Sequence, residues 1–113
     1  MQFNAQRQQY DEVYPQAENG IVLRNDRPVG RMLVNRSEHE ITLIDIALLP
    51  EYRNAGIGTD LVQKLLAEAF VARKPVRLHV WKSNPAMRLY ERLGFSVVGD
   101  QSAYLEMLFQ PQI

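Results

Sequence analysis

The chain has 113 residues, 46% of them hydrophobic, which suits one domain over residues 1–113 with a single core. Its 13 basic and 13 acidic residues cancel and it has no cysteine, so the sequence predicts no nucleic-acid partner, no disulfide and no thiolate metal site. No apolar run approaches the about 20 residues that cross a bilayer, and the polar start is no signal peptide, so we expect no membrane partner and a cytoplasmic location.

The first third of the chain predicts one helix followed by a hairpin. Residues 3–14 suit a helix that ends before the next proline, because the residue before a proline avoids the helical region. Residues 18–20 are expected to break the chain. The β-rich runs 21–24 and 29–34 are then expected to pair across a turn at residues 25–28.

The middle of the chain predicts a central strand and a long helix. Residues 41–49 are apolar on both faces except at Thr42 and Asp45, as in a strand that is covered on both sides. Apolar side chains recur at helical spacing in residues 59–72 and are expected to pack on the sheet. They are Leu61, Val62, Leu65, Leu66, Ala69 and Phe70.

The last third predicts a strand, a helix and a closing hairpin. Residues 76–81 alternate between apolar and polar side chains, as in a strand with one face in the core. Asn84 is expected to cap a helix whose first residue is Pro85. Residues 95–98 and 103–109 are expected to pair around a turn. The full order, α-β-β-β-α-β-α-β-β, predicts an α+β protein.

A glycine-rich turn joins the central strand to the long helix and reads Arg-Asn-Ala-Gly-Ile-Gly. The first N–H groups of a helix have no partner within it and carry partial positive charge, which suits phosphates. Glycine removes side chains that would hold a ligand away, and the arginine adds a fork of donors. We therefore predict a diphosphate site formed by Arg53, Asn54, Ala55, Gly56, Ile57, Gly58 and Thr59.

Two familiar glycine loops do not fit this turn. A phosphate loop of the Walker A type needs a lysine directly after its last glycine, but Thr59 follows Gly58. A dinucleotide fingerprint needs glycine or alanine where Leu61 stands. The remaining alternative is a tight turn whose glycines serve geometry alone.

The turn resembles the acetyl-CoA binding motif of the GNAT acyltransferase superfamily, whose signature is Arg or Gln, two residues, Gly, one residue, and Gly or Ala. A second block, residues 83–95, resembles the later strand end, helix and turn of that family. The resemblance covers residues 20–109 and implies a mixed, mainly antiparallel sheet flanked by helices. It also implies that the family's first strand and first helix are missing, which would expose a sheet edge that a homodimer could cover.

The resemblance implies acetyl-CoA as co-substrate, with the pantetheine arm lying as an added strand beside Ile46, Ala47 and Leu48. Asn84 would contact this arm, cap the helix, or do both. Tyr90 matches the tyrosine whose hydroxyl faces the sulfur in the family, so it is the predicted acid. The alternative is a core tyrosine.

The general base is harder to predict. His79 stands where some relatives carry a carboxylate base, and an ordinary imidazole is mostly neutral at pH 7. Asp45 carries the one charge within the central strand, and we expect it to interact with His79 directly or through water. Alternatively, Asp45 satisfies a structural donor and His79 is simply exposed. Glu40 is a third candidate, and we assign no metal.

Three functional classes follow from the sequence. The first is an N-acyltransferase that moves acetyl from acetyl-CoA directly to a primary amine of a small molecule, peptide or protein. The second is a CoA-binding module without turnover, and the third is a structural fragment that another chain completes. A motif of this kind says little about the acceptor.

Overall fold

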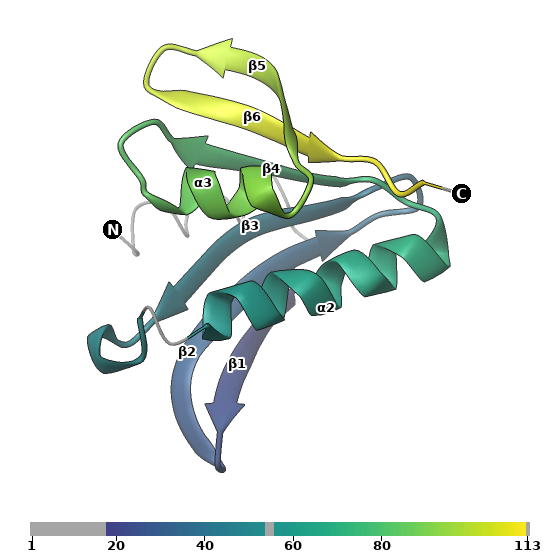
Figure 1. The fold of residues 1–113 in the computed structure, drawn as a ribbon. Coiled ribbons are helices and arrows are strands. Elements are labelled where there is room, and N and C mark those ends of the chain that lie inside the picture. Colours follow the sequence, from purple (N-terminus) through teal and green to yellow (C-terminus); the bar gives the residue numbers. More distant parts are fainter. Residues whose placement is uncertain (1–17, 54–55, 113) are drawn as a thin grey trace.

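The computed structural model describes residues 18–53 and 56–112, which form six strands, two α-helices and a short 3-10 helix (Figure 1). The helix predicted over residues 3–14 lies outside the described residues, and so do Asn54 and Ala55. The bounds are β1 Glu18–Arg24, β2 Arg27–Arg36, β3 Ile41–Leu48, η1 Pro50–Tyr52, α2 Ile57–Ala72, β4 Val76–Trp81, α3 Ala86–Arg92, β5 Ser96–Gln101 and β6 Tyr104–Phe109.

The strands form one sheet in the order β1-β2-β3-β4-β6-β5. All neighbouring pairs are antiparallel except β3 and β4, which are parallel and joined through α2. A parallel pair needs a long crossover, and a helix commonly supplies it. Apart from the short η1, the order of the described elements is the predicted one, and the α+β class is confirmed.

Two predicted breaks are wrong. Residues 18–20 are the start of β1, where Glu18 pairs with Val34. The first hairpin turns at Asn25 and Asp26, within the predicted turn, and their φ angles of 51° and 65° are those of a two-residue type I′ turn. The turn expected after residue 98 is also later, because β5 continues to Gln101. In both cases a neighbouring strand supplies partners that outweigh local turn preference.

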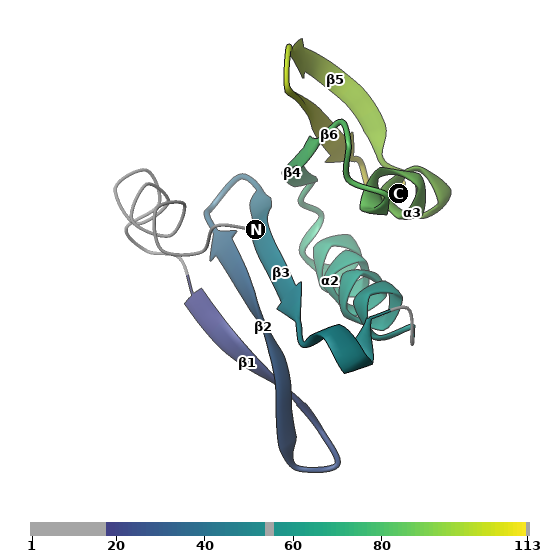
Figure 2. The ribbon, with the colours of Figure 1, turned by 90° about the vertical axis from the view of Figure 1, so that its left-hand side faces the viewer.

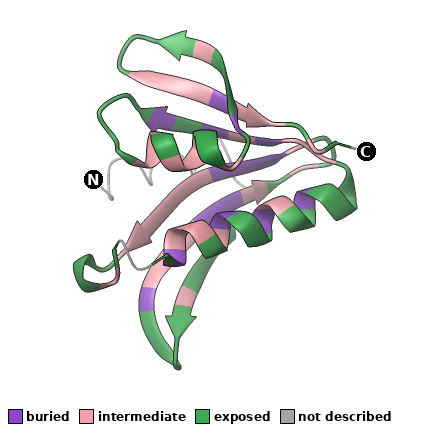
Figure 3. Ribbon diagram, viewed as in Figure 1, coloured by how far each residue is buried: buried purple, intermediate pink, exposed green. Residues whose placement is uncertain are grey.

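The core lies between the sheet and the two helices, which cover the same face (Figures 1 and 2). In α2 the side chains of Val62, Leu65 and Ala69 are buried, as the helical spacing predicts. Phe70 belongs to the predicted stripe but is 56% exposed in the last turn of α2. Figure 3 shows buried and intermediate positions alternating with exposed ones along this helix. Strand β4 alternates as predicted, with Val76, Leu78 and Val80 buried and its other side chains on the opposite face.

Gly30 holds β2 close to the end of β3. A Cβ at this position would collide with the carbonyl oxygen of Ala47 and lie 2.8 Å from Cδ2 of Leu48. We expect Gly30→Ala to lower the free energy of unfolding by about 2–3 kcal/mol, as overpacking does. Urea denaturation measures the change. Gly20→Ala in β1 is the matched control, because its Cβ would meet Met32 O at an ordinary 3.8 Å.

Candidate functional site

Strands β3 and β4 pair at one end and separate at the other. Their register contains three pairs, Ile41 with Val76, Thr42 with Arg77 and Leu43 with Leu78. Both strands continue beyond the last pair, β3 to Leu48 and β4 to Trp81, and they diverge as they do so (Figure 1). The second half of β3 is therefore hydrogen-bonded to a strand on its β2 side alone, within the described residues.

A β-bulge lies where the separation begins. Leu33 pairs with Asp45 and the next residue of β2, Val34, pairs with Leu43, so Ile44 is an extra residue in β3. A bulge of this kind bends its strand and increases the local twist. It therefore accounts for the departure of β3 from β4 directly after Leu43.

The free edge of β3 directs backbone groups into the space between the separated strands. The amide of Leu49 donates to the carbonyl of Val29 at 2.8 Å, so Leu48 and Gly30 form a non-hydrogen-bonded pair. In such a pair the N–H and C=O of Leu48 point away from β2, and by alternation those of Ile46 do too. The N–H and C=O of Ala47 point toward β2. Two of the three residues predicted to contact a pantetheine arm, Ile46 and Leu48, thus direct backbone groups into this space.

Helix α2 begins beside this space with a left-handed glycine, Gly56, at φ 80°. Among the described residues, the first helical hydrogen bond runs from the amide of Asp60 to the carbonyl of Gly56 at 3.0 Å. The amides of Ile57, Gly58 and Thr59 precede it and have no helical partner within this described part of the chain. A Cβ at Gly58 would meet no heavy atom of the described residues within 4 Å. This end of α2 thus combines amide donors with open space, which fits a diphosphate.

Arg53 connects the glycine turn to the end of β3. Its Nε donates to the carbonyl oxygen of Leu48 at 3.2 Å, and its side chain is exposed. A guanidinium in this place adds positive charge between the free edge of β3 and the N-terminus of α2.

Tyr90 extends from α3 against the core, where its ring meets Phe95 edge-on at 5.6 Å between centroids. Burial raises the pKa of Tyr90, and the negative charge of Asp45 raises it further. The phenol is therefore kept protonated at neutral pH, which is the state that a general acid requires.

Asp45 is half-buried in β3 near the bulge. Burial raises the pKa of Asp45, while the positive charge of Arg31 opposes that shift. The predicted direct interaction with His79 is not found, because no ion pair joins the two among the described residues. His79 instead lies 3.9 Å from Glu106, measured from Nε2 to Oε1. The charge of Asp45 interacts with Tyr90 and Arg31.

The raised pKa of Asp45 predicts how stability depends on pH. A carboxyl with a raised folded pKa contributes stability below its unfolded pKa of about 3.9, and this is lost as pH rises through the folded value. We expect Asp45→Asn to increase the free energy of unfolding more at pH 7 than at pH 4, measured in urea. Asp100→Asn is the opposite control, because a hydrogen bond from Lys82 lowers the pKa of Asp100. An equal effect of Asp45→Asn at both pH values would contradict the assignment.

Two other predicted residues have clear local partners. Asn84 accepts a hydrogen bond at Oδ1 from the amide of Ala86 at 2.9 Å. It therefore acts at the start of α3, although the helix begins at Ala86, one residue later than predicted. Glu40, the third candidate for the base, is bound by Arg77, with Nε and Oε2 3.0 Å apart. This contact makes Glu40 a structural acceptor.

The sequence reasoning missed Glu106, which the structure places beside His79. Glu106 faces His79 because the two residues pair directly in the β4–β6 register. It is the one charged residue within the apolar run of β6, which is a signal that could have been noticed. Its partner depends on strand order, however, and β6 lies between β4 and β5 in the sheet.

The fold and the site define an α+β protein whose sheet opens beside the first turn of a crossover helix, an arrangement suited to an extended amide chain with an anionic end. Among the described residues there is no cluster of side chains that could hold a metal ion. No helix of the described part is both long and apolar enough to span a membrane.

The chain belongs to the acetyltransferase (GNAT) family, because its sequence matches the profile of that family over residues 2–95. It is 34% identical over 86 residues to the [ribosomal protein bS18]-alanine N-acetyltransferase of Haemophilus influenzae, an alignment that covers 74% of this chain and 58% of the relative. It is also 45% identical over 60 residues to an N-alpha-acetyltransferase of Sulfurisphaera tokodaii, covering 50% of this chain and 35% of that protein. The chain thus spans little more than half of the first relative's length.

Solved structures show the same fold at low sequence identity. The ribosomal-protein-S18-alanine N-acetyltransferase of Escherichia coli superposes with a TM-score of 0.76 at 24% identity, covering 87% of this chain and 71% of that one. A GNAT family acetyltransferase of Elizabethkingia anophelis with acetyl-CoA bound gives 0.77 at 13% identity, covering 95% and 84%. These likenesses establish the architecture alone.

Proposed function

We propose that this chain is an N-acetyltransferase that moves the acetyl group of acetyl-CoA directly to a primary amine. The observation that supports it most is the separation of β3 from β4 next to the N-terminus of α2. An extended amide arm needs a strand edge, and a diphosphate needs clustered N–H donors. The two features adjoin here, and they fit the two parts of CoA.

In this proposal the residues of the site divide the binding of acetyl-CoA among them. The amides of Ile57, Gly58 and Thr59 bind the diphosphate, with Arg53 adding positive charge. The outward N–H and C=O of Ile46 bind the pantetheine arm, the N–H of Leu48 faces its thioester end, and Asn84 borders the arm. Asn54, Ala55 and Ala47 complete the same segment of chain as predicted members of the site.

The chemistry needs one group to take a proton from the amine and another to protonate the sulfur. An alkylamine has a pKa near about 10.4 and must lose a proton before it can attack the thioester. His79 is the proposed base, and Tyr90, with its raised pKa, is the proposed acid. The amide of Leu48, which points into the space, is placed to polarise the thioester oxygen. Asp45 acts through its charge on Tyr90.

The acceptor that we favour is the terminal amine of a peptide or protein. Two of the similar proteins are named for the alanine of a ribosomal protein or for an α-amine. A small-molecule amine is the second candidate. We infer a cytoplasmic protein that acts on cytoplasmic acceptors.

Two measurements on the purified chain test the proposed function. Calorimetry with acetyl-CoA should give a 1:1 complex, and thiol release should follow when peptides with free N-termini are added. Mass spectrometry then identifies the acetylated amine, with lysine-only peptides and polyamines as competing acceptors. Binding without thiol release would indicate a CoA-binding module, and absence of binding would indicate a structural fragment.

A further inference from the structure

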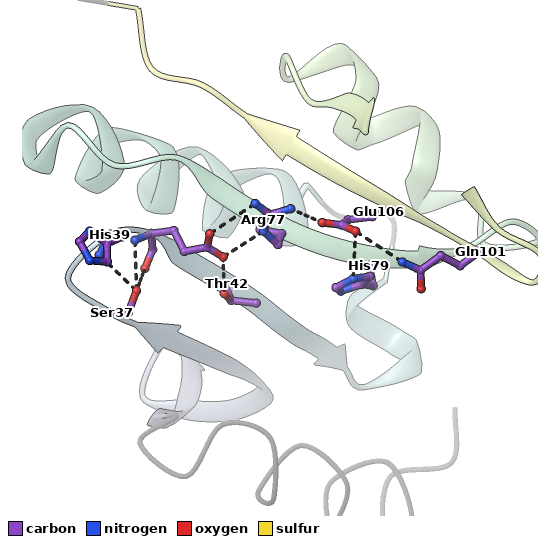
Figure 4. Close-up of polar contacts among 8 residues, drawn as sticks. Ser37, His39, Thr42, Arg77, His79, Gln101 and Glu106 are labelled. Atoms are coloured by element: carbon purple, nitrogen blue, oxygen red, sulfur yellow. Dashed lines mark hydrogen bonds and ion pairs between the residues drawn. The ribbon is translucent and has the colours of Figure 1, made fainter. Parts of the chain in front are cut away.

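A polar cluster lies on the face of the sheet opposite α2 and α3, at the edge of the space between the strands (Figure 4). Leu78 is the last residue of β4 that pairs with β3, and His79 directly follows it. Its side chain is 39% exposed and its ring meets Tyr104 edge-on at 5.6 Å. His79 therefore borders the proposed acyl site from one face of the sheet, whereas Tyr90 belongs to the helix-covered face.

Glu106 is fixed beside His79 by several contacts. Oε2 of Glu106 accepts a hydrogen bond from Nη1 of Arg77, and Arg77 is itself held by Glu40. Oε1 accepts from Nε2 of Gln101 at 3.5 Å and lies 3.9 Å from Nε2 of His79 (Figure 4). Because Arg77 engages one oxygen, the other stays directed toward the imidazole.

We propose that Glu106 is a positioning residue that orients His79 as the base for the acceptor amine. The inference rests on the proposed function. Glu106 is poorly suited to be the base itself, since its side chain is only 20% exposed and Arg77 already binds it. A distance of 3.9 Å is an ion-pair distance rather than a hydrogen bond, and closing by about 1 Å would form the bond. Catalytic contacts are often long before substrate binds.

The arrangement assigns the two ring nitrogens of His79. When Nε2–H faces the Glu106 carboxylate, Nδ1 of the neutral ring is the free acceptor. Nδ1 can then take a proton from the acceptor ammonium, and Glu106 stabilises the imidazolium that results. This carboxylate holds the tautomer and the orientation without accepting the proton.

The proton balance of the transfer is as follows. The acceptor ammonium loses two protons, of which the first passes to Nδ1 of His79 and then to solvent. The nitrogen lone pair forms the C–N bond, the C–S bond breaks, and the thiolate takes the hydroxyl proton of Tyr90. The second proton leaves nitrogen as the amide forms and restores Tyr90. The products are the acetylated amine and CoA with a free thiol.

Several other charges and titratable groups surround His79, and the test must separate them from Glu106. Strand β6 contributes Glu106 and Tyr104, strand β4 contributes Arg77, and Glu40 binds Arg77 from the β3 side. Helix α3 packs on the other face, with Tyr90 toward the core.

A double-mutant cycle on kcat tests the proposal. We expect His79→Gln to lower kcat at least 100-fold and Glu106→Gln to lower it about 10-fold, with KM for both substrates changed less than threefold. In the His79→Gln background, Glu106→Gln should have no further effect, because Glu106 acts through His79.

Asp100→Asn is the matched control. Asp100 lies on β5, and its exposed carboxylate is bound by Lys82. The substitution should leave kcat and both KM values unchanged. If wild-type protein turns over and Glu106→Gln keeps its kcat, the role of Glu106 is refuted while the proposed function stands. Equal effects of Glu106→Gln with and without His79 would also refute it. A wild-type protein that never releases thiol would refute the proposed function itself.

Discussion

Replacing Gly58 with glutamate is expected to stabilise the fold and abolish most CoA binding. Gly58 lies in the first turn of α2, and a Cβ there would meet no heavy atom of the described residues within 4 Å. Glutamate is a better helix former than glycine by about 0.5–1 kcal/mol, and a negative charge near a helix N-terminus is favourable. The same charge would repel a diphosphate by about 3–4 kcal/mol at 4–5 Å, which weakens binding more than 100-fold.

Gly58→Ala separates the charge from the loss of glycine. It should raise the free energy of unfolding by about 0.5–1 kcal/mol. It should also weaken CoA binding far less than glutamate does, because the added methyl group carries no charge and meets no heavy atom of the described residues within 4 Å. Calorimetry with CoA and urea denaturation give both quantities for each variant. A Gly58→Glu variant that binds CoA as tightly as wild type would show that the diphosphate does not lie at this helix end.

Removing the hydroxyl of Tyr90 is expected to lower kcat by about 10²–10⁴-fold, the usual contribution of a positioned acid. The ring of Tyr90→Phe would still pack against Phe95 and the core, so the Kd for acetyl-CoA should change less than threefold. Burial and the charge of Asp45 raise the pKa of Tyr90. Because the active form is protonated, wild-type kcat should hold up to a pH above the ordinary tyrosine value of about 10.

Asp45→Asn provides an independent check on this acid. Without the charge of Asp45, the pKa of Tyr90 should fall, and the basic limb of kcat should move to lower pH. In Tyr90→Phe that limb should disappear. If Tyr90→Phe keeps kcat within threefold across the pH range, Tyr90 is a core residue and the thiolate is protonated by another group.

Much of the fold could be predicted because short-range patterns determine it. The alternation of β4 and the helical stripe of α2 follow from burial on one face, and both are as expected apart from Phe70. Predicted turns failed where residues with weak strand preference pair with a neighbour. The 18–20 segment illustrates this, since β2 supplies its hydrogen bonds.

The candidate site was less predictable because it depends on contacts between distant strands. The glycine turn and Tyr90 are visible as local motifs, and their assigned roles stay predictions. The partner of His79 was expected on β3, at Asp45, because Asp45 carries the one charge within that central strand. Glu106 is the residue beside it, since β6 inserts between β4 and β5 and pairs with β4 residue by residue.

The short register of β3 and β4 also bears on how rigid the molecule is. Three residue pairs and the helix α2 connect one half of the sheet, made of β1, β2 and β3, to the other half, made of β4, β6 and β5. A ligand lying between the separated ends of β3 and β4 would contact both halves of the sheet. Its affinity and the free energy of unfolding are therefore linked. A substitution that brings the ends of β3 and β4 together without ligand would therefore make the protein more rigid and hinder the entry of its own substrate.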